Sequence, residues 1–346
     1  MDDRKIIQNR ILEKINDKYD KSEGSFYYDN AAALAIELED KYKDLYAILD
    51  KYFVDTSSGE FLRRKAEERG VYWKTPTKAT TTVIVTGGEG AKIVKGDKVA
   101  SDTVNFTFLE DKIIDSEGKI EVKVICEEYG SIGNVPVDSI KYFPITLKGL
   151  TSVTNQNPVT NGYDGETDEE LRQRYYDKVR TPATSGNKYH FRNWAKEVTG
   201  VGDARVFPLW NGNGTVKVVI INSNKKGADK ELIDKVFNHI EENRPIGAEV
   251  TVISANEDSI DIKVSLVVDT KNYNIENVKE DIISSITEYL KEIAFIGNYV
   301  SYAKIGSLIY NTKGVIDYSN LKLNDKTANI TIGDEEVAVL GGVTIE

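Results

Sequence analysis

The sequence predicts a multidomain α+β protein with N-terminal helices, a β-rich domain, two related α+β units and C-terminal β-hairpin strands. Three patterns predict it. Apolar residues recur every three or four positions up to about residue 54, they alternate with polar residues from Thr80 to Pro144, and both patterns mix after Asn155. A chain of 346 residues is long enough for several cores. We expect boundaries that give domains at 1–75, 76–150, 151–256 and 257–346.

Composition and charge exclude several classes of protein. The formal net charge is -11, from 45 basic and 56 acidic residues, which argues against binding to nucleic acid phosphates. The first residues contain no apolar run typical of a signal peptide, and no stretch in the chain is apolar enough to predict a membrane span. Cys126 is the only cysteine, so an intrachain disulfide and a zinc site built mainly on thiolates are excluded. We expect a protein made and kept in a reducing cytoplasm.

The N-terminal region predicts two amphipathic helices, at residues 6–15 and 30–54. The second carries apolar residues spaced 4, 3, 4 and 3 apart, as in the seam of a short coiled coil: Leu38, Tyr42, Leu45, Leu49 and Tyr52. One interpretation is a helix that packs on its own domain. The other is a bundle with a partner, which we favour because the opposite face is charged and little nearby sequence could cover the seam.

A shorter helix and a β-rich domain follow. Ser58 or Thr56 is expected to cap a helix that Gly70 ends. The strands after Thr80 are separated by tight turns such as "GGEG", "DSEG" and "YGSIGNVP". The first of these resembles a phosphate-binding loop only superficially, because Ala91 stands where that motif needs a glycine directly before the lysine. A turn is therefore predicted there.

The remainder of the chain predicts alternating helices and strands. Helices are expected at 168–179, 187–198, 229–243, 275–294 and 302–311, and strands at 204–207, 215–221, 249–253 and 259–268. Segment 189–207 resembles 302–321, and segment 216–250 resembles 262–300. We interpret these similarities as a tandem duplication of one α+β unit, and expect short hairpin strands in the last 27 residues, 320–346.

An acidic cluster marks the start of the helix at 168–179. Five carboxylates occupy the seven positions 164–170: Asp164, Glu166, Asp168, Glu169 and Glu170. A calcium-binding EF-hand loop beginning at Asp164 would need glycine at its sixth position and glutamate at its twelfth, where this sequence has Glu169 and Tyr175. A capping box formed by Thr167 and Glu170 explains the cluster better, since acidic residues also suit the positive end of the helix dipole.

No catalytic, cofactor-binding or metal-binding residues are predicted, and no cofactor is expected. His190 and His239 lie on different predicted helices, and Cys126 lies in the middle of a strand, where a small buried residue is expected. Gly-x-Ser-x-Gly, Ser-x-x-Lys and dinucleotide-binding motifs do not occur in the sequence.

Several motifs follow one another along the chain, among them "DTSSGEFLRRKAEERGV", "EEYGSIGNVPVDSI", "GLTSVTNQNPVTNGYDGETDEELRQRY", "TSGNKYHFRNWAKEVTGVGDARVFP", "NRPIGAEVTV" and "ANITIGDEEVAVLGGVTI". This collinear series resembles the baseplate J-like family of contractile phage tails and tail-like bacteriocins. The order and spacing of the motifs hold from about residue 55 to the end. The sequence departs from the family at "KIVKGDKVAS", where Val94 and Lys95 replace an expected proline and alanine but Gly96 remains at the bend.

This resemblance implies a structural wedge subunit of a baseplate rather than an enzyme. It implies a tail protein I-like partner, a second copy of this chain in each wedge, neighbouring wedges, and contacts with sheath-initiator and hub proteins. The N-terminal helices would form a bundle with the partner, and the α+β units would join neighbouring copies in a ring. Arg172 and Arg174 are further candidates for a subunit contact. The subunit would be made in the bacterial cytoplasm and assembled into the baseplate of a phage tail or tail-like particle. Neither nucleic acid binding nor membrane insertion is expected.

Two alternative functions stay open at this stage. The β-rich stretch could be a carbohydrate- or receptor-binding module, although its only aromatic residues between Thr80 and Val137 are Phe106, Phe108 and Tyr129. The chain could also be a cell-wall hydrolase that uses Glu127 and Glu128. That alternative is weaker because adjacent strand residues point to opposite faces and cannot flank one bond.

Overall fold

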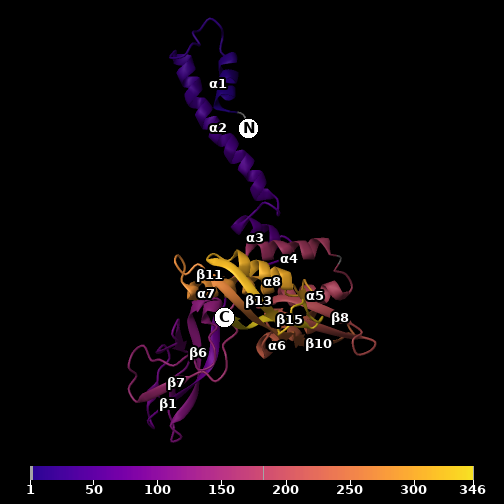
Figure 1. Ribbon diagram of the computed structural model, residues 1–346. Helices are drawn as coiled ribbons and strands as arrows, with labels where there is room; N and C mark the ends of the chain where they lie inside the picture. The colour runs from indigo at the N-terminus through magenta and orange to yellow at the C-terminus, as the bar shows by residue number, and fades with distance from the viewer. Residues whose placement is uncertain (1–2, 182, 346) are drawn as a thin grey trace. The chain divides into compact units, whose positions relative to one another are not determined.

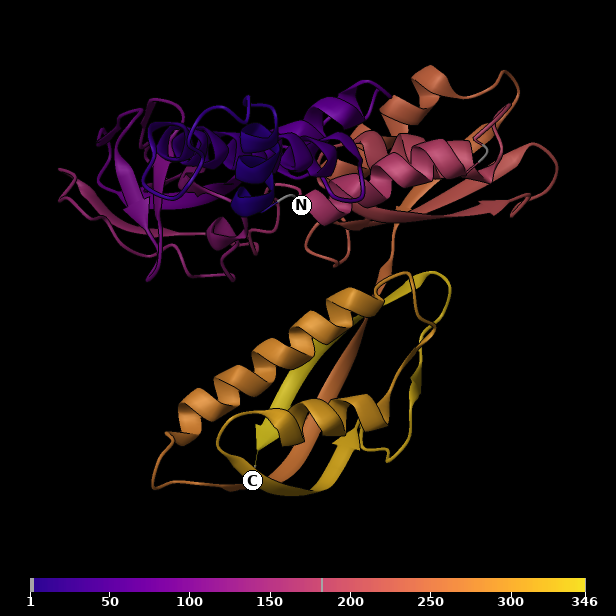
Figure 2. The same cartoon turned by 90° about the horizontal axis from the view of Figure 1, so that it is seen from above.

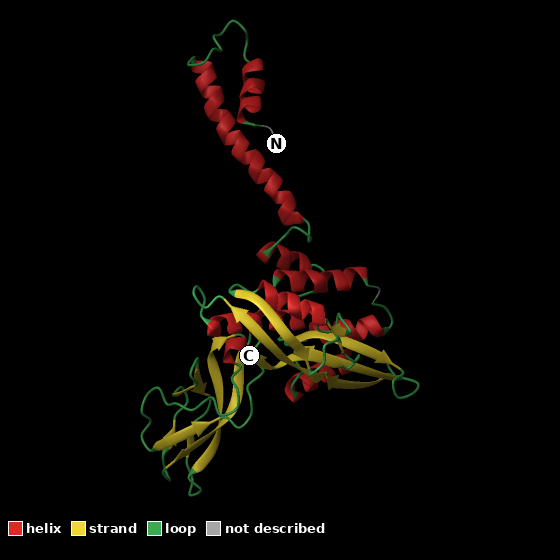
Figure 3. Cartoon of the chain, viewed as in Figure 1, coloured by secondary structure: helices red, strands yellow, loops and turns green. Residues whose placement is uncertain are grey.

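The computed structural model describes residues 3–181 and 183–345, and the chain divides into two compact units. Unit 1 comprises Met1–Trp73 and Thr167–Val179, and unit 2 comprises Lys74–Glu166 and Arg180–Glu346. Every strand of the described residues belongs to unit 2, whereas the secondary structure of unit 1 is helical (Figure 3). The α+β prediction with N-terminal helices is confirmed.

Unit 1 begins with a helical hairpin. Helix α1 (Arg4–Glu13) packs along the first part of the long helix α2 (Phe26–Tyr52), as Figure 1 shows. Ile7 on α1 and the small residues Ala31 and Ala35 on α2 are buried, and alanines let two helices approach closely. The hydroxyl of Ser25 caps α2 by accepting a hydrogen bond from the Tyr28 N–H.

The other two helices of unit 1 share a small core. Helices α3 (Gly59–Glu67) and α4 (Asp168–Arg180) contribute to a cluster formed by Leu62, Ala66, Val71 and Leu171. Ser58 occupies the N-cap position of α3, but its side chain makes no capping hydrogen bond, and Thr56 bonds back to the carbonyl of Asp50. The prediction that Ser58 or Thr56 caps α3 through its side chain is therefore wrong. The first N–H of α3, from Gly59, donates to the carboxylate of Asp168 instead.

Unit 2 starts with an antiparallel five-stranded sheet in the order β3-β4-β6-β1-β7. The strands are β1 (Lys78–Gly87), β3 (Lys98–Ala100), β4 (Asn105–Phe108), β6 (Lys119–Tyr129) and β7 (Leu150–Thr154), with the short pair β2 (Lys92–Ile93) and β5 (Lys112–Ile113) beside them. Because β7 pairs with β1, the expected boundary between residues 150 and 151 falls inside this sheet. Gly90 and Gly96 have positive φ angles of 81° and 97°, which confirms the turns predicted at both positions.

The middle part of unit 2 is a three-stranded sheet covered by two helices. Its elements are α5 (Lys188–Glu197), β8 (Val201–Pro208), β9 (Thr215–Asn222), α6 (Lys230–Asn243) and β10 (Glu249–Ser254). Strand β9 is central, antiparallel to β8 and parallel to β10. Helix α5 packs on β8 and helix α6 on β10, so the apolar helix faces and the sheet enclose one core.

The C-terminal part forms a second three-stranded sheet with two helices. It contains β11 (Asn256–Val268), α7 (Ile275–Ile293), β12 (Tyr299–Val300), α8 (Tyr302–Asn311), β13 (Val315–Leu323), β14 (Ile330–Thr331) and β15 (Glu336–Ile345). Strand β11 is central, antiparallel to β13 and parallel to β15. Helices α8 and α7 pack on β13 and β15, and Figure 2 shows them side by side over the sheet.

The two sheets have the same spatial arrangement of strands and helices, but these elements follow one another in a different order along the chain. In each, a central strand has an antiparallel neighbour packed under one helix and a parallel neighbour packed under the other. The middle part places the first helix and strand, α5 and β8, ahead of the central strand, whereas the C-terminal part places their equivalents, α8 and β13, after it. This arrangement supports the related units inferred from the two pairs of similar segments.

The C-terminal strands differ from the prediction in how they pair. They do not form a hairpin with one another: β13 and β15 lie on opposite sides of β11, and β14 pairs with β12. The connection after Leu323 is long enough to cross the sheet, and the buried Val337 and Ala338 of β15 gain a core beside β11. The burial of these apolar residues therefore determines which strand β15 pairs with, rather than a turn that would pair it with the preceding strand.

We predict that the thiol of Cys126 is unreactive in the folded protein. Its side chain is buried in the core of the β1–β7 sheet, and burial raises the pKa of the thiol, so little thiolate forms at neutral pH. Titration with a chromogenic disulfide should give almost no reaction in buffer and one thiol per chain in denaturant. Rapid stoichiometric reaction in buffer would contradict this packing, and a Cys126→Ser variant gives the blank.

Candidate partner interface

The second part of α2 exposes large apolar side chains. Of the predicted seam, Leu45, Leu49 and Tyr52 are 58%, 53% and 59% exposed, Tyr42 is also exposed, and Leu38 is half-buried. Three further apolar residues of this region are exposed and were not predicted from the sequence: Tyr46, Ile48 and Phe53. Unit 1 therefore carries an uncovered apolar surface, called here the α2 surface and formed by Leu38, Tyr42, Leu45, Tyr46, Ile48, Leu49, Tyr52 and Phe53.

The width of the α2 surface indicates how many neighbours it could contact. At the 3.6 residues per turn of an α-helix, these side chains cover an arc of about 160°. A two-stranded coiled coil needs only a narrow stripe, whereas a helix that packs against two neighbours needs a wider one. The wide arc could have been found from the sequence, because Tyr46, Ile48 and Phe53 flank the seam residues on both sides of a helical projection.

The remaining side of α2 is charged. Lys43 pairs with Glu39 at 3.3 Å and with Asp40 at 3.1 Å, and both carboxylates lie one turn before it. These surface pairs contribute little to stability, but they keep this side of the helix in water. The helix is therefore amphipathic along a part that α1 does not cover.

Arg172 is anchored within unit 1. Its guanidinium donates to the carbonyl oxygens of Val54 and Ser57, both at 2.8 Å, and pairs with Glu169. The side chain is only 16% exposed, and its contacts tie α4 to the segment that follows α2. This is an intrachain role that the sequence did not predict; a contact of Arg172 with another subunit stays a prediction.

Arg174, the second arginine of α4, also has a backbone partner. Its guanidinium donates to the carbonyl oxygen of Tyr72 at 3.1 Å. On the same helix Leu171 is buried, Tyr175 is half-buried and Val179 is 49% exposed, so the apolar side of α4 is buried only along its first turns.

The acidic cluster serves local structure in each unit. In unit 1, Thr167 and Glu170 exchange the hydrogen bonds of the predicted capping box, with the Glu170 N–H donating to the Thr167 hydroxyl at 3.2 Å. In unit 2, Asp164 accepts from the N–H and hydroxyl of Ser131, and Glu166 accepts from the Lys74 N–H. Within residues 3–181 and 183–345, no three His, Cys, Asp or Glu side chains are grouped as a metal site requires.

The other residues considered for chemistry lie apart. His190 stacks on Trp194, and its Nδ1 accepts from the Gly186 N–H, whereas His239 on α6 contacts Glu197 at 3.0 Å. Glu127 pairs with Lys98 at 2.6 Å, and that pairing lowers the pKa of the carboxyl. A carboxylate held ionised in this way is poorly suited to act as a general acid.

The β1–β7 sheet offers few aromatic groups for sugar binding. Phe106 and Phe108 are fully buried in its core, and of the three aromatic residues considered only Tyr129 is exposed, with the Lys78 ammonium 4.8 Å from its ring centroid. An aromatic groove built on these residues is therefore not formed. In the part of the chain that the structure describes, none of the helices has the length and hydropathy needed to cross a membrane.

Comparisons with known proteins match three consecutive parts of the chain to one family. The "Baseplate J-like protein barrel domain" matches residues 82–162, the "Baseplate J-like central domain" 183–254 and the "Baseplate J-like protein C-terminal domain" 260–346. In Bacillus subtilis (strain 168), "Uncharacterized protein YqbT" and "Phage-like element PBSX protein XkdT" are 37% and 35% identical, each over 98% of this chain and 96% of the relative.

Two more distant matches have names that refer to baseplates. "Baseplate protein gp47" of Escherichia phage Mu is 25% identical over 77% of this chain and 78% of its own length. A chain in the cryo-EM structure of the anti-feeding prophage baseplate aligns over 97% of this chain and 89% of its own, with 10% identity and a TM-score of 0.39.

We predict that Arg172→Ala destabilises unit 1 in the isolated protein. The change removes two hydrogen bonds from a charged donor to buried or half-buried carbonyls, which should cost about 2–4 kcal/mol. Chemical denaturation followed by the fluorescence of Trp73, which packs against the same core, should report it. Gln173→Ala on the exposed side of α4 is the control. An unchanged free energy of unfolding for the Arg172→Ala protein would show that these hydrogen bonds do not stabilise unit 1.

Proposed function

Because the chain belongs to the baseplate J-like protein family, we propose that it is a structural wedge subunit of the baseplate in a contractile tail or tail-like injection particle. The match to the three family models covers most of unit 2, and the relatives extend the similarity into unit 1. The proposed role is mechanical: the subunit links its neighbours and transmits the trigger for sheath contraction, which requires no catalytic residue.

The α2 surface is the single observation that carries this proposal furthest. Six of its side chains between Leu45 and Phe53 are each more than half exposed. Monomeric proteins rarely leave such a continuous apolar patch in water, and patches of this kind mark sites of protein contact. The charged pairs of Lys43 on the other side of α2 favour an orientation in which only one side of the helix is buried.

The partner that fits best is a helical bundle supplied by other wedge chains. We assign it to a tail protein I-like subunit together with α2 of a second copy of this protein. An arc of about 160° accommodates two neighbouring helices rather than one. Residues 1–75 would then form the partner-binding region, while the domains of unit 2 would contact neighbouring copies, the sheath initiator and the hub.

The proposed mechanism is a change of interfaces between rigid parts. Receptor contact at the edge of the plate would shift the contacts between wedge subunits, open the ring and release the sheath. Rotation of rigid subunits about interfaces is an established way to transmit such a signal. It requires contacts that are stable in two arrangements, which moderate-sized interfaces with polar rims can provide.

We predict that Leu45→Glu combined with Leu49→Glu abolishes co-purification with the tail protein I-like subunit. Two carboxylates in the centre of the bundle would have to be buried without partners, so the complex should weaken by at least about 1000-fold. Co-expression of both chains followed by affinity purification of the partner measures the loss. A chain that begins near Ser57, and therefore lacks α1 and α2, should also fail to co-purify.

The matched control for that experiment is Asp40→Ala combined with Lys43→Ala. These residues lie on the charged side of α2 and form an exposed pair. The control should retain the partner, and circular dichroism should show that both variants keep their helices. Co-purification of the truncated chain with the partner would contradict the proposal that the N-terminal helices bind the partner.

We also predict the stoichiometry of the complex. If α2 packs against one helix of a second copy and one of the partner, native mass spectrometry of the co-expressed proteins should give two copies of this chain for each partner. A complex with one copy of each would contradict the two-neighbour interpretation of the α2 surface and leave only a two-chain contact.

A further inference from the structure

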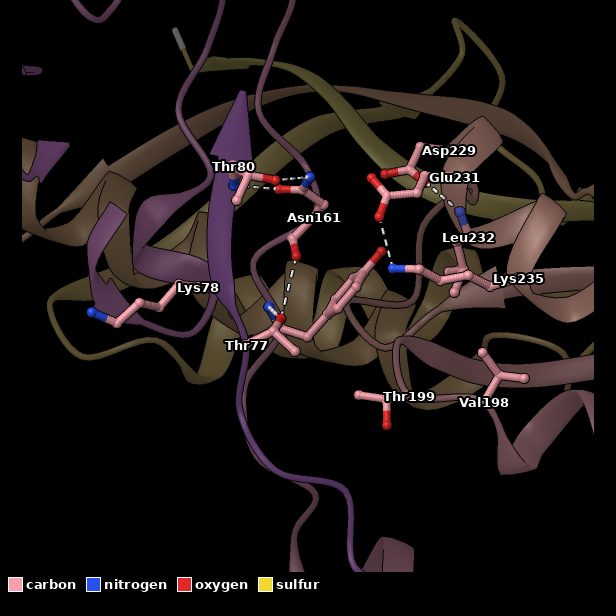
Figure 4. Close-up of a pocket in the computed structure, with 11 residues that line it drawn as sticks. Thr77, Lys78, Thr80, Asn161, Val198, Thr199, Asp229, Glu231, Leu232 and Lys235 are labelled. Carbon is pink, nitrogen blue, oxygen red and sulfur yellow. Dashed lines mark hydrogen bonds and ion pairs between the residues drawn. The ribbon is translucent and has the colours of Figure 1, made fainter. Parts of the chain in front are cut away.

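A cavity of about 470 Å³ lies within unit 2, where the β1 end of the first sheet meets the middle part of the unit. Figure 4 shows its two walls. Thr77, Thr80 and Asn161 form one wall, and Asp229, Glu231 and Lys235 of the α6 region form the other. The remaining lining residues are Lys78, Tyr163, Val198, Thr199 and Leu232. The cavity is wide enough for one large side chain or a small ligand.

Most polar groups of the first wall are already satisfied within the chain. Asn161 exchanges two hydrogen bonds with Thr80, both at 2.9 Å. The hydroxyl of Thr77 bonds to the Asn161 carbonyl and accepts from the Tyr163 N–H. The ammonium of Lys78 donates to the Glu127 carbonyl, and Figure 4 shows this side chain pointing away from the cavity. This wall is thus rigid and nearly neutral.

The hydroxyl of Tyr163 is the exception. Tyr163 is only 6% exposed, and one edge of its ring lies against Gly200, where an added Cβ would come within 2.7 Å of Cε2. No described residue forms a hydrogen bond with this hydroxyl, which is accessible from the cavity, although a largely buried tyrosine usually finds a partner. The close packing on Gly200 prevents the ring from moving away to seek another partner, so a ligand in the cavity could supply it.

The cavity is acidic at the point where Tyr163 reaches it. Asp229 uses one carboxylate oxygen to cap α6 through the Leu232 N–H, and Glu231 pairs with Lys235 at 2.7 Å. With Lys78 turned away, two carboxylates face one ammonium. Burial together with the charges of Asp229 and Glu231 raises the pKa of Tyr163, in accord with a negative potential at its hydroxyl.

We infer that this cavity receives an arginine side chain from another protein chain. A guanidinium carries five N–H donors in a planar fork, enough to reach the free oxygens of Asp229 and Glu231 and the Tyr163 hydroxyl together. The apolar Val198 and Leu232 suit the methylene stem that leads to it. A lysine ammonium is a compact donor and reaches fewer of these acceptors. The inference stands whether or not the wedge assignment holds.

The test uses the full-length protein with methyl-labelled Leu and Val and titrates N-acetyl-arginine methylamide by NMR. The methyl signals of Leu232 and Val198 should shift saturably, with a dissociation constant on the order of 1 mM for so small a probe. The citrulline analogue has the same shape without the charge and should cause no saturable shift. The lysine analogue should bind several-fold more weakly. Absence of a shift with the arginine probe, or equal shifts with the citrulline or lysine probe, would overturn the inference.

Variants of the lining residues give independent readouts. Tyr163→Phe and Glu231→Gln should each weaken the arginine probe by about tenfold, the loss expected for one hydrogen bond to a charged group. Lys235→Met removes the competing ammonium and should tighten binding. Asp234→Asn removes a charge from the exposed side of the same helix and should change little. Thermal unfolding checks that each variant is folded, and unchanged or reversed effects in the folded variants would contradict the assignment.

Discussion

The fold depends on a short acidic segment whose carboxylates each hold a different part of the chain. In unit 2, Asp164 fixes the turn at Ser131 and Glu166 accepts from the backbone of Lys74. In unit 1, Asp168 caps α3 from 109 residues away, and Glu170 completes the capping box of α4. Hydrogen bonds from N–H groups to carboxylates are stronger than those between neutral groups. A segment of seven residues therefore organises local structure in both units, which explains its density of charge without any metal ion.

The contacts of this segment that could be predicted from the sequence are those between residues close together in the chain. A capping box follows a spacing of three residues, so Thr167 and Glu170 could be identified directly. The cap of α3 could not, because Ser58 is the better local candidate and Asp168 is remote in sequence. The same limit applies to β15: its strand pattern is local, but its parallel pairing with β11 follows from burial in the folded unit. Arg172 and the cavity at Tyr163 likewise depend on contacts between distant residues.

The α2 surface poses a different physical problem. Burial of a fully exposed leucine or phenylalanine contributes about 1.5–3 kcal/mol. Leu45, Ile48 and Leu49 obtain only part of that contribution in the single chain, since each remains more than half exposed. The hairpin with α1 stabilises only the first part of α2, through Ile7, Ala31 and Ala35. Under the proposed association, the second part would gain much of its stability on binding, and its folding would be coupled to assembly.

In unit 2, a shared buried cluster joins the two α+β sheets. Val219 and Ile221 of β9 share a buried cluster with Ala294 and Val337 from the C-terminal part. Arg205 of β8 donates to the backbone carbonyls of Gly297 and Asp334, and its guanidinium lies 4.7 Å from the ring centroid of Phe295. Phe295 has a φ of 59°, a conformation that costs a bulky residue about 1–2 kcal/mol and persists only when its surroundings hold it. A contact between two sheets that includes a shared core and the constrained Phe295 is expected to resist small rotations of one sheet against the other. A trigger transmitted through this part of the molecule would therefore pass between chains, at their interfaces, rather than by bending between these two sheets.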